Sequence, residues 1–210
     1  MVAIDRLTAG ELRDRLPQLH PVYRQCFAAP PWSESPAELD DYPARLARHT
    51  GYPGAYGFVA TDDGELVGAV YGWPAPPDLP DGSDFDRAVR NAITPDVAPL
   101  LVAPAAVVAE LMVAPAHRRH GIARALLTRF VDAHPRAWLA THPEAPAVAL
   151  YESLGWIRRA AYIVGDLPLV LYTSETTSPR EAALPRESSC RADRPLSQTP
   201  VDRRPPSRRI

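Results

Sequence analysis

The chain has 210 residues, a mass of 23.0 kDa and a formal net charge of -2, which suits one domain with an appendage and argues against a dedicated nucleic-acid binder. Its apolar runs are too short to cross a bilayer, so we expect no membrane span. Cys26 and Cys190 lack the spacing of metal ligands, which argues against a zinc site or a disulfide framework and favours a reducing cytoplasm.

The N-terminal part predicts a strand followed by two helices. Residues 2–7 are typical of a short strand, and Thr8 with Glu11 three residues later forms the capping box that begins a helix. The apolar stripe of this helix continues over residues 12–27. After a Pro-rich break, a second helix is expected over residues 35–47.

A hairpin and an insertion come next. The β-prone runs at residues 56–60 and 66–73 flank an Asp-Gly pair, which is a strong hairpin signal. Residues 74–104 are rich in Pro and Asp, with one short helix expected over 85–93. We interpret this segment as an insertion over a binding face rather than as core.

The second half of the body alternates strands with helices. The expected strands are residues 105–113, 137–141, 162–164 and 169–172, and the expected helices are residues 123–133 and 145–154. This order predicts an α/β fold, a mixed sheet with helices on both faces. The body is expected to end at residue 173, because residues 174–210 have few large apolar side chains and predict a disordered tail rich in Pro, Ser and Arg.

The loop after the expected strand 105–113 carries the clearest chemical signal. It contains the pattern Arg118-x-x-Gly121-x-Ala123, and a helix follows directly. Small residues let a ligand approach the backbone, and the free N–H groups of a helix N-terminus attract anions. With Arg119 and Arg124 nearby, this loop predicts a diphosphate site.

Other interpretations of the loop remain open at this point. A phosphate loop would need a Lys-Ser/Thr pair, and a dinucleotide-binding fingerprint would need a third glycine; the sequence has neither. A plain helix N-terminus with solvated arginines also fits the loop taken alone.

Two signatures together resemble the GCN5-related N-acetyltransferases (the GNAT family). The loop is similar to the family pattern Arg/Gln-x-x-Gly-x-Gly/Ala. Downstream, AVALYESLGW at residues 147–156 resembles the pattern Ala-x-x-Leu-Tyr-x-x-x-Gly-Phe, with Trp156 in place of Phe. Glu144 stands where many members carry Asn. The resemblance follows the element order over residues 1–173 and is specific over 107–156.

The resemblance implies a single GNAT-like domain over residues 1–173, with a mixed, mostly antiparallel sheet of six to seven strands and a splayed central cleft. It implies acetyl-CoA as co-substrate and no metal. Strand residues would pair with the pantetheine amides, loop N–H groups would hold the pyrophosphate, and a strand N–H near Met112 or Val113 would stabilise the oxyanion. The residues that it assigns to acetyl-CoA are Leu111, Met112, Val113, Arg118, Arg119, His120, Gly121, Ile122, Ala123 and Arg124.

The resemblance also points to two catalytic residues. Tyr151 occupies the family's tyrosine position and would protonate the departing CoA thiolate. Glu110, an acid in an otherwise apolar strand, would serve as general base or anchor the amine; an ion pair with an arginine is the competing interpretation. His142 is a second candidate for proton transfer. Cys26 is expected to pack among apolar residues and not to act as a nucleophile.

His117 and His120 flank the loop and are interpreted as rim residues. The regions that bind the acceptor in the family contain acids mixed with aromatic residues here, which suits a cationic amine. These residues are Trp32, Glu34, Asp40, Asp41, Tyr42, Trp73, Asp78, Asp81, Asp84 and Asp86.

We therefore expect an acetyl-CoA-dependent N-acetyltransferase, a monomer or homodimer, that acts on an amine-bearing small molecule or peptide, with polycations among the candidates. An acyl-CoA-binding module without turnover is the alternative, and a nucleotide-binding domain is a third.

Overall fold

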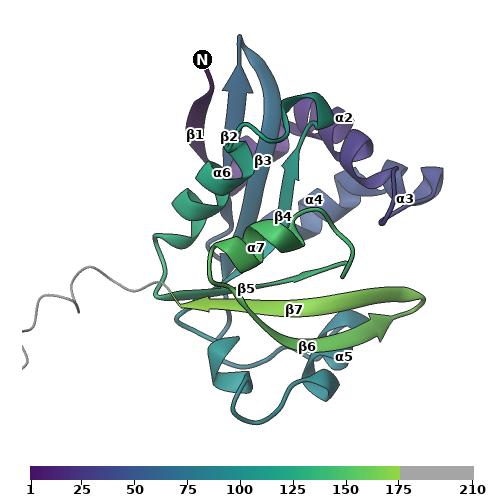
Figure 1. The fold of residues 1–210 in the computed structure, drawn as a ribbon, viewed down its shortest axis with the longest axis vertical. Coiled ribbons are helices and arrows are strands. Elements are labelled where there is room, and N and C mark those ends of the chain that lie inside the picture. The colour runs from purple at the N-terminus through teal and green to yellow at the C-terminus, as the bar shows by residue number, and fades with distance from the viewer. Residues whose placement is uncertain (176–210) are drawn as a thin grey trace, which may run out of the picture. The chain divides into compact units, whose positions relative to one another are not determined.

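A computed structural model describes residues 1–175 of the chain, and the expected tail lies outside the described residues except for its first two. One seven-stranded sheet, in the order β1-β2-β3-β4-β5-β7-β6, forms the centre of this part (Figure 1). Only β4 and β5 are parallel neighbours, so the expectation of a mixed, mostly antiparallel α/β sheet is confirmed. The strands are β1 (Ala3–Thr8), β2 (Tyr56–Asp62), β3 (Glu65–Pro74), β4 (Ala105–Val113), β5 (Arg136–Thr141), β6 (Ile157–Val164) and β7 (Leu167–Glu175).

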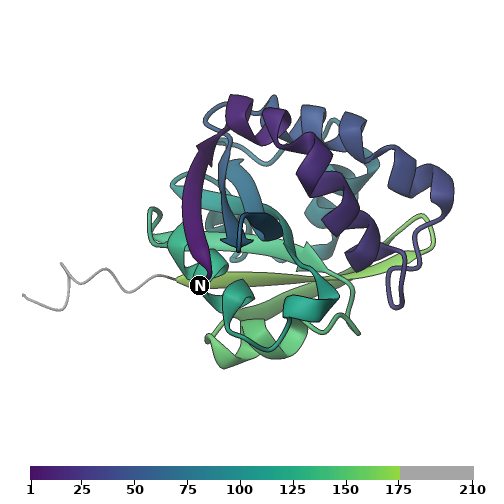
Figure 2. The same cartoon turned by 90° about the horizontal axis from the view of Figure 1, so that it is seen from above.

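Helices cover both faces of the sheet. Figure 2 shows the first four helices together on one side and α6 with α7 on the other, and α5 packs against β6. Figure 1 shows β5, β7 and β6 running crosswise to β1–β4. The helices are α1 (Ala9–Asp14), α2 (Leu16–Phe27), α3 (Pro36–Asp40), α4 (Tyr42–Thr50), α5 (Asp84–Ala92), α6 (Ile122–Val131) and α7 (Val148–Ser153), with 3-10 turns η1 (Ala98–Leu100) and η2 (Pro115–His117).

The first half has four short helices where two long ones were expected. The capping box is present, since Glu11 N–H donates to Thr8 Oγ1 at 3.3 Å and Thr8 N–H donates to the Glu11 carboxylate at 2.8 Å. However, Pro17 and Pro43 each lie in the first turn of a new helix. A proline lacks the N–H that a continuing helix needs and clashes with the preceding turn, so each expected helix is broken there.

The insertion at residues 74–104 contributes core, which corrects the expectation that it only covers a binding face. Val89 and Leu101 are buried in a cluster with Trp138 of β5 and Leu169 of β7. Trp138 Nε1–H also donates to the Leu101 carbonyl at 2.9 Å. The insertion therefore closes the end of the sheet on which β5, β6 and β7 lie. At the other limit of the domain, β7 pairs with β5 through Glu175, two residues past the expected end.

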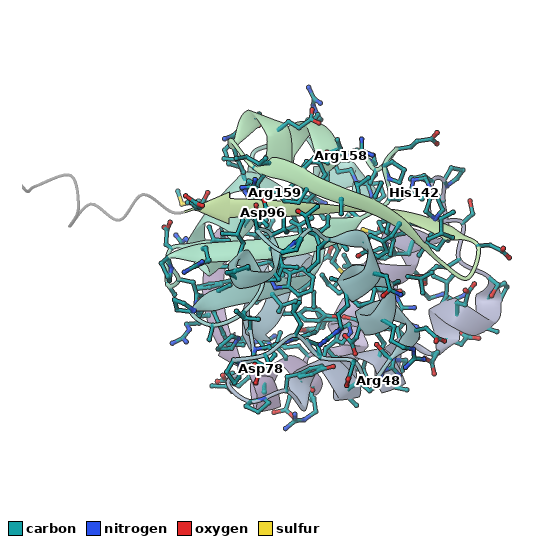
Figure 3. The ribbon with its side chains drawn as sticks, turned by 90° about the horizontal axis from the view of Figure 1, so that it is seen from below. Arg48, Asp78, Asp96, His142, Arg158 and Arg159 are labelled. Atoms are coloured by element: carbon teal, nitrogen blue, oxygen red, sulfur yellow. The ribbon has the colours of Figure 1, made fainter. Side chains whose placement is uncertain are left out.

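Asp96 and Arg159 show how the insertion meets β6 at the surface. The two side chains lie near each other in Figure 3. Hydrogen bonds from Thr94 and from its own backbone lower the pKa of Asp96, and the charge of Arg159 adds to this effect. Within residues 1–175, no helix has the length and apolar character to cross a membrane.

Candidate active site

A cavity lies where β4 and β5 separate. The two strands pair only over residues 105–107 of β4, so the remainder of β4 has an open edge. A cavity of about 1880 Å³ fills the gap and is lined by residues from both faces of the sheet. Pockets for one drug-sized ligand measure roughly 300–1,000 Å³, so this cavity has room for two molecules.

A β-bulge in β4 sets which way its side chains point. Tyr71 of β3 pairs with Glu110 and Gly72 pairs with Val108, so Ala109 has no partner. Side chains alternate along a strand, and a regular β4 would direct Glu110 toward α6. The extra residue instead directs Glu110 to the face that carries α2 and α4, as bulges near functional sites often do.

The open edge of β4 presents backbone groups to the cavity. Ala114 N–H donates to Val67 O of β3 at 2.8 Å. Because neighbouring residues direct their backbone groups to opposite sides of a strand, Val113 and Leu111 face the open edge and Met112 faces β3. Of the two expected oxyanion donors, Val113 is therefore the one that faces the cavity, while the Met112 side chain is buried.

The loop after β4 has the shape expected of an anion site. Gly121 begins α6 with φ +79°, and Arg119 has φ +69°. Arg118 donates from Nε to Val113 O at 3.1 Å, which holds the loop against the end of β4. The expected loop residues that line the cavity are Arg118, Arg119, Gly121, Ile122, Ala123 and Arg124, whereas the exposed His120 does not.

We expect Gly121→Ala to weaken coenzyme A binding at least tenfold. Gly121 lines the cavity, and a Cβ there meets no protein atom within 4 Å, so the added methyl group would stand beside the backbone that a ligand has to approach. An L-residue is also strained at this φ. Isothermal titration with coenzyme A measures the effect. Gly64→Ala is the matched control, because Gly64 has φ +85°, an equally open surround and no place in the cavity wall. Equal affinity of both variants would contradict the assignment of the loop.

Glu110 lies in a small network of charged residues. Its side chain is 10% exposed, and its carboxylate is 3.9 Å from Nη1 of Arg45. The same Nη1 donates to Glu34 at 3.1 Å, and Glu34 also accepts from the Tyr23 hydroxyl at 2.7 Å. Arg45 is thus held more closely by Glu34 than by Glu110. The expected alternative of an ion pair is present, but it is long.

Burial dominates the ionisation of Glu110. It raises the pKa of this carboxyl, the charge of Arg45 offsets part of the increase, and the charge of Glu34 adds to it, so that the pKa is about 7 instead of 4.5. A carboxylate with a pKa near neutrality is well matched to accepting a proton at physiological pH.

Tyr151 faces the same cavity from the other side of the sheet. It lies on α7, is 4% exposed and packs beside Trp156 and Tyr172. Burial, and after it the charge of Glu110, raises the pKa of its hydroxyl. The phenol therefore stays protonated at neutral pH. The structure brings Tyr151 and Glu110 to one cavity, although they belong to opposite faces.

Two weaker candidates are engaged elsewhere. His142 accepts the backbone N–H of Glu144 on Nδ1 at 3.1 Å, and it does not line the cavity. The Cys26 thiol donates to Val113 O at 3.3 Å, and burial raises its pKa, so the thiol stays protonated. His117 lines the cavity beside the loop, as a rim residue would.

The structure brings only some of the expected acceptor-binding acids to the cavity. Asp40 pairs with Arg24, and Asp84 pairs with Arg87 at 2.6 Å. Asp78 and Asp81 are exposed outside the cavity wall; Figure 3 labels Asp78.

Of the remaining expected residues, Asp41 pairs with Arg48 at 3.9 Å, and Tyr42 is fully buried and stacked on Tyr23. The ones that line the cavity are Trp32, Glu34, Trp73 and Asp86.

The cavity residues that sequence reasoning missed include Arg45, His49 and Tyr52, on and after α4. None belongs to a motif, and only the packing of α4 against β3 and α2 brings them near β4. Among the described residues, no group of three or more His, Cys, Asp or Glu side chains is placed to hold a metal ion.

Comparison with known proteins identifies the family of this chain and solved structures with a similar fold. Residues 16–156 match the Acetyltransferase (GNAT) family. An acetyltransferase from Thermus thermophilus has a similar structure, with 20% identity and a TM-score of 0.57 over 84% of this chain and 97% of that one. No curated protein gives a significant match.

Two further similar structures were solved with ligands. The paia N-acetyltransferase from Thermoplasma acidophilum, in complex with coenzyme A, is 13% identical, with a TM-score of 0.51 over 81% of this chain and 98% of that one. The yncA protein from Salmonella typhimurium, with its cofactor acetyl-CoA, is 15% identical, with a TM-score of 0.53 over 83% and 94%. At these identities the likeness concerns the fold.

Proposed function

Because the chain belongs to the GNAT acetyltransferase family, we propose that it is an N-acetyltransferase that moves an acetyl group from acetyl-CoA to the amine of a small molecule or peptide. One observation carries the proposal. Glu110, with a pKa near 7, and Tyr151, with a raised pKa, face one cavity where β4 separates from β5.

The described residues fit acetyl-CoA as the first substrate. The open edge of β4 offers the backbone of Leu111 and Val113 to an extended chain of amides, in the manner of an added strand. The N-terminus of α6 and the adjacent Arg118 and Arg124 suit the pyrophosphate. Acetyl-CoA supplies an activated acyl group with a thiolate leaving group.

The side chains can then divide the proton transfers between them. Glu110 accepts a proton from the ammonium, and the neutral nitrogen attacks the acetyl carbon. The Val113 N–H donates to the carbonyl oxygen as negative charge develops there. The C–N bond forms, the C–S bond breaks, and Tyr151 donates its proton to the thiolate. The new amide releases its extra proton to water, and Tyr151 recovers one.

The function is tested by following thiol release from acetyl-CoA over a panel of amines, with mass spectrometry of the product. We expect at least one amine to be acetylated on nitrogen. If coenzyme A binds but no amine on the panel gives turnover, the alternative of an acyl-CoA-binding module without turnover is favoured.

We expect Tyr151→Phe to separate these two functions. Removal of the hydroxyl should lower kcat about 100-fold, because the thiolate then leaves unprotonated. The affinity for coenzyme A should stay within about twofold, since the ring packing on Trp156 and Tyr172 is retained. Steady-state rates and isothermal titration give the two numbers. An unchanged kcat would remove Tyr151 from the mechanism.

A further inference from the structure

Aromatic rings and prolines form part of the cavity wall. Prolines lack a backbone N–H, so this wall offers few hydrogen-bond donors and suits an apolar body. Exposed aromatic rings in a cavity favour flat, apolar or cationic partners. Residues of this wall include Trp32, Tyr52, Trp73, Phe85, Pro31 and Pro76.

Trp73 is the one aromatic residue of β3 and β4 that lines the cavity. Tyr71 is the cross-strand partner of Glu110, and Trp73 follows two residues later on the same face of β3. At about 3.3 Å per residue and about 4.8 Å between strands, the Cα atoms of Trp73 and Glu110 lie roughly 8 Å apart. That separation spans a nitrogen, a short chain and one ring.

The Trp73 ring is held in place by its neighbours. Tyr52 stacks on it with ring centroids 4.1 Å apart and an interplanar angle of 12°. The ring of His49, on α4, lies 5.3 Å from it between centroids. Burial, followed by the charges of Arg45 and Arg48, lowers the pKa of His49 to about 4. His49 is therefore neutral at physiological pH and places no positive charge beside the ring.

The charges around Glu110 favour a cation there. Arg45 neutralises one of the two carboxylates in the network, since it bonds Glu34 at 3.1 Å and lies 3.9 Å from Glu110. One negative charge remains at Glu110 when it is ionised. Asp40 and Asp84 are paired with arginines. Glu38 and Asp86 also line the cavity, where each takes part in the capping box of its own helix.

We propose that the acceptor is an arylalkylamine, a primary amine joined by a chain of two or three atoms to an aromatic ring. Its ammonium lies on Glu110, and its ring lies against Trp73 and the proline-rich wall. This inference rests on the proposed function and names its substrate class. It predicts that amines without an aromatic ring are poorer substrates, because they leave Trp73 and the aromatic wall uncontacted.

The test compares kcat/KM for 2-phenylethylamine, n-propylamine, ethanolamine and spermidine with acetyl-CoA. We expect 2-phenylethylamine to exceed each of the others at least tenfold. Tyr52→Ala and Trp73→Leu should lower its kcat/KM about tenfold and leave that of n-propylamine within threefold. Tyr52 is 44% exposed, so its variant keeps the test valid if Trp73→Leu does not fold. Ile163→Ala, at an apolar residue 64% exposed outside the cavity, is the control.

The outcomes separate the two proposals. If ethanolamine or spermidine is acetylated as well as 2-phenylethylamine, the substrate class is wrong and the acetyltransferase remains. If no amine is acetylated, the proposed function fails, and quenching of tryptophan fluorescence by 2-phenylethylamine, in the presence of coenzyme A, still reports on the aromatic site. The absence of any such quenching would overturn the inference by itself.

Discussion

Glu110→Gln is expected to lower kcat about 1,000-fold at neutral pH. The proposed reaction needs a neutral amine, and a general base contributes roughly 10²–10⁴-fold to such a step. Glutamine keeps the size of the side chain but cannot accept the proton. Steady-state thiol release measures the loss, and isothermal titration checks that coenzyme A still binds.

The pH profile of the wild-type protein gives a second check on the same group. The base must be ionised to work, so kcat should rise with pH and level off above about pH 7, where Glu110 titrates. The kcat of the Glu110→Gln variant should not show this rise with pH. Glu144→Gln, at an exposed acid outside the cavity wall, is the control. A Glu110 variant with normal kcat would mean that this carboxylate only pairs with Arg45.

The raised pKa also sets the sign of a stability difference. Unfolded Glu110 would ionise at its ordinary value of 4.5, whereas the folded chain keeps the proton to about pH 7. Stability is therefore lost as the pH rises between these values. Relative to Glu110→Gln, the free energy of unfolding of the wild type should fall by on the order of 3 kcal/mol from pH 4.5 to 7. Parallel pH dependences of the two proteins would contradict the burial of this charge.

Gly72→Ala is expected to lower the free energy of unfolding by at least about 3 kcal/mol, which is at the upper end of the effects of overpacking. A Cβ at Gly72 would lie 1.8 Å from the Val107 carbonyl oxygen and 3.0 Å from Cζ of Phe130. The backbone of β4 approaches β3 closely at the bulge, so no side-chain rotation relieves the clash.

Urea unfolding followed by circular dichroism measures this loss. Gly82→Ala is the matched control, because a Cβ there meets nothing within 4 Å and the backbone is not in the left-handed region. It should leave stability unchanged or raise it slightly. If both variants unfold at the same urea concentration, the close approach at Gly72 is not needed for the fold.

Local signals in the sequence predict much of the fold. The strand expected at residues 105–113 has the same limits as β4, because a continuous apolar run is typical of a central strand. The capping box at Thr8 and the Asp-Gly hairpin also act over a few residues and are confirmed. Each of these features depends on neighbours in the chain.

The geometry of the site depends on contacts between distant residues. Arg45 and Glu110 are 65 positions apart, and their pairing requires the packing of α4 beneath the sheet. The bulge at Ala109 has no local signature, yet it decides which face Glu110 joins. Composition alone places Asp40 and Asp84 in one acceptor site, whereas in the structure each forms an ion pair with a different arginine. The spacing of the motif predicts the position of the loop at residues 118–124, whereas tertiary packing determines where the other site residues lie.

The cavity is lined from both faces of the sheet. The loop at residues 118–124 and Tyr151 lie on one side, and Glu110 with Trp73 lies on the other. Two substrates that approach from opposite faces can be present at the same time. Under the proposed reaction, the acetyl group then passes directly within a ternary complex, and a ping-pong scheme with a covalent acetyl-enzyme is unnecessary. Neither substrate has to leave before the other arrives, so initial-rate plots with both substrates varied should intersect rather than run parallel.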